Sequence, residues 1–221
     1  MSPLVIFGLG SVARLAYSCA TYELGLDVLA FAVDSASHTD SELFGLPVVD
    51  AESLAQKFSP ESASIFVAVG YRSMLKRASV WQRFADAGWD TPSIVSPRAY
   101  VAETSVIGLN CLVMAGAIVE PGSCLGDNNL IWSNSTICHD CRIGSHNFFA
   151  SNSTIGGEVT IGDRSFFGFS STILQQRSVG SDVVIAAAAL LTQDATSLGR
   201  YIGVPARRDR DIDPTIGVRI S

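Results

Sequence analysis

The chain has 221 residues, which suits one large domain or two modest ones. Its formal net charge of −6 argues against a general affinity for nucleic acid, whose phosphate backbone attracts basic proteins. The apolar run from Leu4 to Phe7 is too short for a signal peptide or a membrane span. The five cysteines form an odd set at low density, which favours a reducing compartment over a disulfide scaffold. We therefore expect a cytoplasmic protein without a membrane or nucleic-acid partner.

The start of the chain predicts a strand–turn–helix–strand unit. An apolar strand at 3–8 is followed by a glycine-rich turn, a helix at 12–24 and a second strand at 27–33 that ends at Asp34. In doubly wound folds the N–H groups at such a helix start bind phosphate, and the acidic residue binds ribose. Ala13 stands where the dinucleotide fingerprint has its third glycine. A ligand site and a purely structural turn therefore both remain open.

The segments that follow continue an α/β pattern. In chain order they are an extended stretch at 45–49, a short helix at 51–58, a buried strand at 63–69 that ends at Gly70, and a helix at 71–87 with Arg72, Lys76, Arg77 and Arg83. We expect these basic residues to form a solvated face. The alternative is that Arg72, which lies near the end of the strand, helps to hold an anionic ligand. A domain boundary is expected at Ser96–Pro97.

From Val101 to Leu191 an apolar residue recurs at every sixth position without a slip. A period of six fits neither an amphipathic helix nor a hairpin sheet, and is typical of the hexapeptide repeat of a parallel β-helix. The apolar side chain fills the axis, the small residue two positions earlier fits a corner, and a following glycine allows the turn. After the repeat stops near Ser197, we expect Pro205 and the neighbouring arginines to cap the open end of the coil.

The repeat contains two of the three histidines, His139 and His146; the third, His38, lies in a polar loop and is interpreted as incidental. His139 follows the axial Ile137 by two positions, which places it outside the packed axis near a turn. An imidazole is largely neutral near pH 7 and can accept a proton from a nucleophile. His139 is therefore a candidate general base, with a surface histidine of no special role as the alternative.

A zinc site is the competing hypothesis for the sequence Cys-His-Asp-Cys at 138–141. Cys141 occupies the small inward position of its hexad, and no second ligand pair stands at zinc-site spacing. A three-histidine site would require a symmetric oligomer to pool His139 and His146. We therefore expect no metal.

Several stretches, spread over nearly the whole chain, carry a family resemblance. They are FGLGS at 7–11, AVD at 32–34, AVGYRSMLKR at 68–77, SIVSPRAYV at 93–101, TICHDCRIG at 136–144 and YIGVPARR at 201–208. Together they resemble the bacterial sugar acyltransferases of the sialic acid O-acetyltransferase type. This group includes N-acetyltransferases of nucleotide-linked 4-amino-sugars, such as the bacillosamine and perosamine enzymes.

The resemblance implies three parts: a Rossmann-like nucleotide-sugar-binding domain at 1–96, a left-handed parallel β-helix of about five coils at 97–196, and a C-terminal cap or tail at 197–221. It also implies a homotrimer, with acetyl-CoA as co-substrate lying between neighbouring coils. The substrate-binding positions that match the family are Gly8, Gly10, Ser11, Asp34 and Gly70.

The same resemblance assigns catalysis to His139, with Asp140 beside it. Asp140 can orient the imidazole only if a turn brings the two adjacent side chains together, because neighbours in a strand point to opposite faces. The N–H of Gly157 matches the donor to the thioester carbonyl. The implied cofactor-binding positions are Gly157, Ala187, Ala188, Pro205, Arg207 and Arg208.

Two departures from the family stand out. Bacillosamine-type members have glycine in place of Ala13, and they carry a second histidine five positions after Ile143, where this chain has Phe148. His146 is nearby but out of register. We expect the hydrogen bond of that histidine to the bound cofactor to be absent or replaced.

The sequence therefore predicts an acetyl-CoA-dependent N-acetyltransferase that acts on the amino group of a nucleotide-linked amino-sugar, in the biosynthesis of a surface polysaccharide such as lipopolysaccharide. Two alternatives remain. One is a sugar O-acetyltransferase of the sialic acid type, and the other is a non-catalytic trimeric scaffold.

Overall fold

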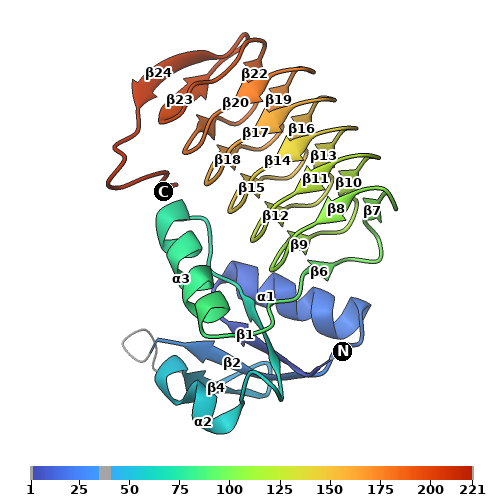
Figure 1. Cartoon of the computed structure of the whole chain (residues 1–221), viewed down its shortest axis with the longest axis vertical. Helices are drawn as coiled ribbons and strands as arrows, with labels where there is room; N and C mark the ends of the chain where they lie inside the picture. Colours follow the sequence, from blue (N-terminus) through green and yellow to red (C-terminus); the bar gives the residue numbers. More distant parts are fainter. Residues whose placement is uncertain (1, 35–40, 221) are drawn as a thin grey trace. The chain divides into compact units, whose positions relative to one another are not determined.

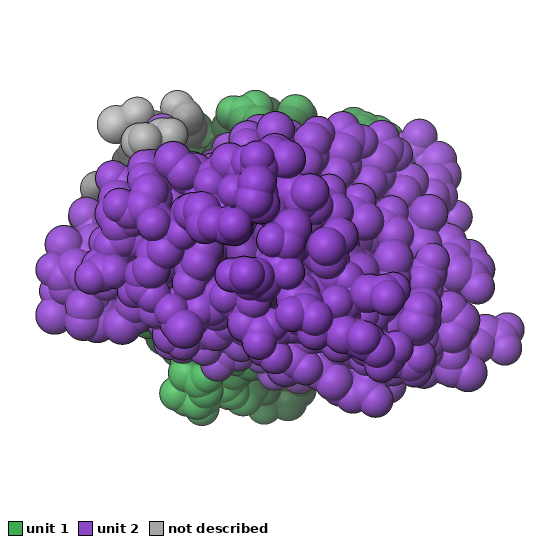
Figure 2. Space-filling view, turned by 90° about the horizontal axis from the view of Figure 1, so that it is seen from above, with its two compact units in different colours: residues 1–70, 79–94 green, residues 71–78, 95–221 purple. Residues whose placement is uncertain are grey.

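The computed structural model describes residues 2–34 and 41–220, so the expectation for His38 lies outside the described residues. The chain forms two compact units (Figure 2). The first contains residues 1–70 and 79–94, and the second contains residues 71–78 and 95–221. Among the described helices, none is long and apolar enough to cross a lipid bilayer.

The first unit is built on a five-stranded sheet with the strand order β3-β4-β2-β1-β5 (Figure 1). The strands are β1 (Leu4–Phe7), β2 (Val28–Val33), β3 (Glu42–Leu43), β4 (Leu46–Asp50) and β5 (Ser64–Val67). The helices are α1 (Ser11–Ser18), extended by a π-helical stretch at Cys19–Glu23, α2 (Leu54–Lys57) and the part of α3 (Met74–Asp86) from residue 79 on. Only β3 runs antiparallel to its neighbour. Strand β1 lies between β2 and β5 and is buried on both faces, as expected for a parallel sheet.

The ends of β1, β2 and β5 lie side by side because Phe7 pairs with Ala32 on one side and with Val67 on the other. The N–H of Gly8 donates to the carbonyl of Ala32 at 2.8 Å. Gly8 has φ +126°, and a Cβ atom there would lie 2.9 Å from the carbonyl oxygen of Ala68, so only glycine fits this turn. The residues that follow β1, β2 and β5 therefore lie close together at one edge of the sheet.

The second unit is a three-sided parallel β-helix in which each hexad contributes a two-residue strand (Figure 1). The first side contains β7 (Tyr100–Val101), β10 (Ile118–Val119), β13 (Thr136–Ile137), β16 (Thr154–Ile155), β19 (Thr172–Ile173) and β22 (Leu190–Leu191). The second contains β8 (Val106–Ile107), β11 (Cys124–Leu125), β14 (Arg142–Ile143), β17 (Thr160–Ile161) and β20 (Ser178–Val179). The third contains β6 (Ile94–Val95), β9 (Leu112–Val113), β12 (Leu130–Ile131), β15 (Phe148–Phe149), β18 (Phe166–Phe167), β21 (Val184–Ile185), β23 (Gly199–Ile202) and β24 (Arg207–Asp211).

The hexad positions stack along the axis as the sequence predicts. Ile137 pairs with Val119 in the preceding coil and with Ile155 in the next, so one coil takes 18 residues. The small inward residues do more than fill corners. Ser123 donates to the carbonyl of Cys138 at 2.7 Å and accepts the N–H of Cys141 at 3.0 Å, so its hydroxyl links two coils. These polar side chains satisfy backbone groups that the short strands leave unpaired.

Arg77 corrects one sequence expectation, because it does not belong to a solvated basic face. Its side chain is fully buried against the β-helix. Its guanidinium donates to the carbonyls of Asn128 and His146, the latter at 3.0 Å, and to Oδ1 of Asn128 at 3.1 Å. Burial lowers the pKa of Arg77 to about 9. A buried guanidinium therefore fixes segment 71–78 to the coil within the second unit.

The tail folds back on the last coil. Strand β23 pairs in parallel with β21, and β24 pairs antiparallel with β23. Arg208 donates to the carbonyl of Leu198 at 2.9 Å, contacts the hydroxyl of Thr196 and forms an ion pair with Asp211 at 2.8 Å. This arginine thus satisfies backbone carbonyls where the hexads end.

Candidate active site

His139 and Asp140 form the turn between β13 and β14. Asp140 has φ +57°, a left-handed conformation, so the chain bends sharply between the two residues. The bend brings Nδ1 of His139 within 3.0 Å of Oδ2 of Asp140. The turn that the sequence argument required is therefore present. Because Nδ1 faces the carboxylate, Nε2 is left as the nitrogen that can accept a proton.

Two further carboxylates surround His139. The N–H of His139 donates to Oε2 of Glu120 at 2.9 Å, and its carbonyl accepts the N–H of Glu158 at 2.9 Å. Glu120 was missed in the sequence, although the 18-residue coil places residues 120 and 121 one coil below residues 138 and 139. The hydrogen bond to Asp140 raises the pKa of His139, with smaller contributions from the charges of Glu120 and Glu158.

Gly157 lies directly against the imidazole of His139. A Cβ atom at Gly157 would stand 2.5 Å from Nε2 of His139, so any other residue would displace the ring. The carbonyl of Gly157 accepts the N–H of Gln176 at 2.9 Å. Within residues 2–34 and 41–220, nothing accepts a hydrogen bond from the Gly157 N–H, which leaves it as a donor beside the imidazole of His139.

A cavity of about 510 Å³ opens beside this pair. Its lining consists of Cys138, His139, Thr154, Gly156, Gly157, Thr172, Ile173, Leu174 and Gln175. The volume and the mixture of apolar and small polar residues suit part of an organic ligand. The candidate general base and a backbone N–H donor thus lie at one cavity.

The cysteines next to His139 are poor metal ligands. Burial raises the pKa of the Cys141 thiol to about 11 and, with Glu120 nearby, also raises that of Cys138. The Cys141 thiol donates to the carbonyl of Gly156 at 3.2 Å, inside the axis. Among the described residues, no group of three His, Cys, Asp or Glu side chains could hold a metal ion.

The remaining expected cofactor residues lie elsewhere on the coil. Ala187 and Ala188 are exposed at the turn from β21 to β22, whereas His139 and Gly157 lie on turns from the first side to the second. Pro205 and Arg207 are exposed in the tail. The structure therefore brings His139, Asp140 and Gly157 together and leaves the other positions on a different corner or in the tail.

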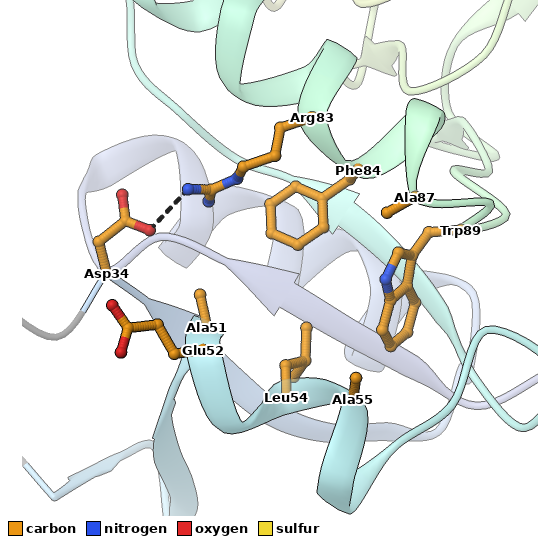
Figure 3. Close-up of a pocket in the computed structure, with 9 residues that line it drawn as sticks. All are labelled: Asp34, Ala51, Glu52, Leu54, Ala55, Arg83, Phe84, Ala87 and Trp89. Atoms are coloured by element: carbon orange, nitrogen blue, oxygen red, sulfur yellow. Dashed lines mark hydrogen bonds and ion pairs between the residues drawn. The ribbon is translucent and has the colours of Figure 1, made fainter.

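The expected substrate residues gather at the carboxyl edge of the sheet in the first unit. Gly10 is the N-cap of α1, and Ser11 is its exposed first residue, so N–H groups are available there for an anion. Gly70 follows β5 and lies against Val12. Asp34 follows β2 and forms an ion pair with Arg83 at 2.9 Å (Figure 3). The sequence did not indicate this partner, because the two residues are 49 positions apart.

Phe148 occupies the position of the family's second histidine and is almost completely buried. It stacks on Phe166 with ring centroids 5.1 Å apart and also contacts Tyr71 and Trp132. Its place is on the third side of the coil, within an aromatic cluster. The Phe148 side chain has no hydrogen-bonding group, and the expectation that the hydrogen bond to the cofactor is absent or replaced stays a prediction.

The hexads around His139 match the model of a known protein family. The family model described as bacterial transferase hexapeptide (six repeats) matches residues 125–157, which contain His139, Asp140 and Gly157. A comparison with curated proteins gives no match.

Solved structures give a finer comparison over nearly the whole chain. PerB from Caulobacter crescentus, in complex with CoA and GDP-perosamine, is 26% identical with a TM-score of 0.84, covering 95% of this chain and 98% of that one. The acetyltransferase domain of PglB from Neisseria gonorrhoeae, in complex with acetyl coenzyme A, is 28% identical with a TM-score of 0.84, covering 93% and 98%. WeeI from Acinetobacter baumannii shares the fold, with a TM-score of 0.82 at 19% identity, covering 94% and 100%.

These neighbours confirm the predicted resemblance and the predicted fold, a Rossmann-like domain followed by a left-handed parallel β-helix. They also confirm the predicted class of enzyme: the chain is an acyltransferase.

Proposed function

We propose that the chain transfers the acetyl group of acetyl-CoA to the amino group of a nucleotide-linked amino-sugar. One observation carries the proposal: Nε2 of His139, oriented through Nδ1 by Asp140, lies against Gly157 at a small-molecule cavity. The support from comparison is that structures bound to CoA with GDP-perosamine, or to acetyl coenzyme A, match over nearly the whole chain.

Acetyl-CoA would supply the activated acetyl group. The sugar amine would attack the thioester carbonyl, the C–S bond would break as the amide C–N bond forms, and CoA would leave as its thiol after taking up a proton. In our proposal Nε2 of His139 takes the proton that the amine loses. Asp140 holds Nδ1 and stabilises the imidazolium that results. The free N–H of Gly157 donates to the carbonyl oxygen as negative charge develops on it.

We further propose that the chain acts as a homotrimer, with acetyl-CoA between neighbouring copies. Ala187 and Ala188, the expected wall of the pantetheine arm, lie on a different corner of the coil from His139. A neighbouring copy would bring the two corners together. Exposed apolar side chains support this, because Leu174 lines the cavity of His139 and Phe169 lies beside Ala188 on the other corner.

The nucleotide-linked sugar would bind the domain at 1–96, at the edge that carries Gly8, Gly10, Ser11, Asp34 and Gly70. The β-helix at 97–196 would carry out the transfer, and the tail at 197–221, with Pro205, Arg207 and Arg208, would lie near the nucleotide end of the co-substrate. We place this reaction in the cytoplasm, in the synthesis of a surface polysaccharide, because nucleotide-linked sugars are the precursors of such polymers.

A mass-spectrometric screen tests the proposal. The purified chain is incubated with acetyl-CoA and a panel of UDP-, GDP- and dTDP-linked amino-sugars, beside matched sugars that carry a hydroxyl in place of the amine. We expect acetylation of one amino-sugar and none of its hydroxyl counterpart. Acetylation of hydroxyl sugars alone, or of none of the panel in spite of CoA binding, would contradict it.

A further inference from the structure

A second cavity, of about 540 Å³, lies within the first unit between α2 and the latter half of α3. Its walls are mostly apolar and include Leu54, Phe84 and Trp89. Figure 3 shows the carboxylates of Asp34 and Glu52 at one end of the cavity and the indole of Trp89 at the other. An apolar cavity with a few polar groups at one end suits a flat heteroaromatic ring.

Arg83 makes an ion pair and two aromatic contacts at the acidic end. Its Nη1 lies 2.9 Å from Oδ1 of Asp34, and its guanidinium lies 4.8 Å from the ring centre of Phe84 and 5.2 Å from that of Phe7. The side chains of Arg83 and Asp34 nevertheless remain 47% and 43% exposed. The pair is thus pre-oriented by aromatic contacts and still open to a ligand.

The cavity adjoins the edge where phosphate is expected to bind. The Gly8 N–H donates to the carbonyl of Ala32, two residues before Asp34, so Gly8 and the Asp34 that lines the cavity follow neighbouring strands at the same edge of the sheet. A nucleotide with its phosphates at Gly10 and Ser11 would pass Asp34 on its way into the cavity. One ligand would then occupy both places.

We propose that this cavity receives the base of the nucleotide-linked sugar and that Asp34, with Glu52 and Arg83 beside it, selects guanine. This inference rests on the proposed function, which leaves the base open. Guanine presents adjacent N–H donors at N1 and N2, which a carboxylate accepts in two parallel hydrogen bonds, and its O6 accepts from a guanidinium.

The other bases fit these groups less well. Uracil and thymine present a single N–H between two carbonyl oxygens, which would face the carboxylates of Asp34 and Glu52. Adenine has no N–H at N1 and presents only its exocyclic amine. An unpaired acceptor opposite a carboxylate is costly, so these groups discriminate by repulsion as well as by attraction.

Calorimetric titration of the full chain with GDP, UDP, dTDP and ADP tests the selection. We expect GDP to bind about 10-fold more tightly than the others, the discrimination typical of a bidentate contact to a base. Asp34→Asn should weaken GDP binding by about the same factor and should not weaken UDP binding, because it removes a carboxylate that repels the uracil carbonyls. Tighter binding of UDP, dTDP or ADP than of GDP would overturn the inference.

A cavity-filling variant tests the location. Ala55 lines the cavity from α2, whereas its exposed neighbour Gln56 is not among the lining residues. We expect Ala55→Phe to weaken GDP binding about 10-fold by occluding the base, and the matched control Gln56→Phe to leave it unchanged, with equal melting temperatures as the check on folding. Equal GDP affinity in the two variants would overturn the location.

The outcome also separates this inference from the proposed function. If UDP or dTDP binds best and the sugar linked to it is acetylated, only the selection of guanine fails. If none of the nucleoside diphosphates binds, both the selection of guanine and the proposal of a nucleotide-linked substrate are wrong.

Discussion

At the scale of single residues, the site depends on the missing side chain of Gly157. Its absence is what lets the imidazole of His139 lie against the backbone of the next coil. The sequence could suggest this glycine through a family motif. It could not show that the Cβ of any other residue would collide with Nε2, because that distance depends on the stacking of coils 18 residues apart.

Gly157→Ala should therefore abolish most turnover by displacing His139. We expect a loss of about 10²-fold or more in kcat, of the order seen when a positioned general base is lost. The test is a double-mutant cycle with His139→Ala. Once the imidazole is gone, Gly157→Ala should add little further loss. Fully additive losses would show that the glycine acts independently of the histidine.

Asp140→Asn should move the pH dependence in a defined direction. Asp140 raises the pKa of His139, and the base must be neutral to act, so activity rises as the pH rises through that pKa. Removing the charge lowers the pKa, so the acid limb of the kcat/KM profile should shift to lower pH while the plateau falls. An unchanged acid limb would mean that the limb reports another group.

At the scale of elements, the hexad period predicts the axis and its corners well, because each strand is only two residues long and the repeat fixes its phase. The period does not predict the partners that lie across the fold. Arg77 binds carbonyls more than fifty residues later in the chain, and Arg83 binds Asp34. A pattern of local hydrophobicity contains no information on such pairs, so both arginines resembled surface charges.

Arg77→Met tests whether that buried contact stabilises the second unit. The change removes the hydrogen bonds that the guanidinium donates to the carbonyls of Asn128 and His146, and the loss of buried hydrogen bonds from a charged donor costs about 1–3 kcal/mol. We expect the free energy of unfolding to fall by at least about that amount in urea titrations. The exposed Arg72→Met serves as the control and should change stability by no more than about 0.5 kcal/mol. Equal effects of the two variants would contradict a role for the buried guanidinium.

At the scale of the whole molecule, the proposed homotrimer rests on the exposed apolar side chains at two corners of the β-helix. Sequence repeats predict the coil but not which corner pairs with which, since that depends on a second copy. Light scattering should give three times the mass of the chain. Leu174→Asp should lower the measured mass to that of a single chain, because a charge would replace an exposed apolar side chain that we place at the interface between copies. Tyr22→Asp, an exposed change in the first unit, should leave the trimer intact. A monomeric wild-type chain would contradict the proposed shared site.

Single-turnover acetyl transfer by His139→Ala tests the central proposal most directly. The acceptor is the amino-sugar that the screen identifies, and product is measured by mass spectrometry with acetyl-CoA binding followed in parallel. We expect the rate to fall by about 10²–10⁴-fold while acetyl-CoA binding stays close to that of the wild type. A near-normal rate in this variant would show that His139 is not the base and would contradict the proposed mechanism.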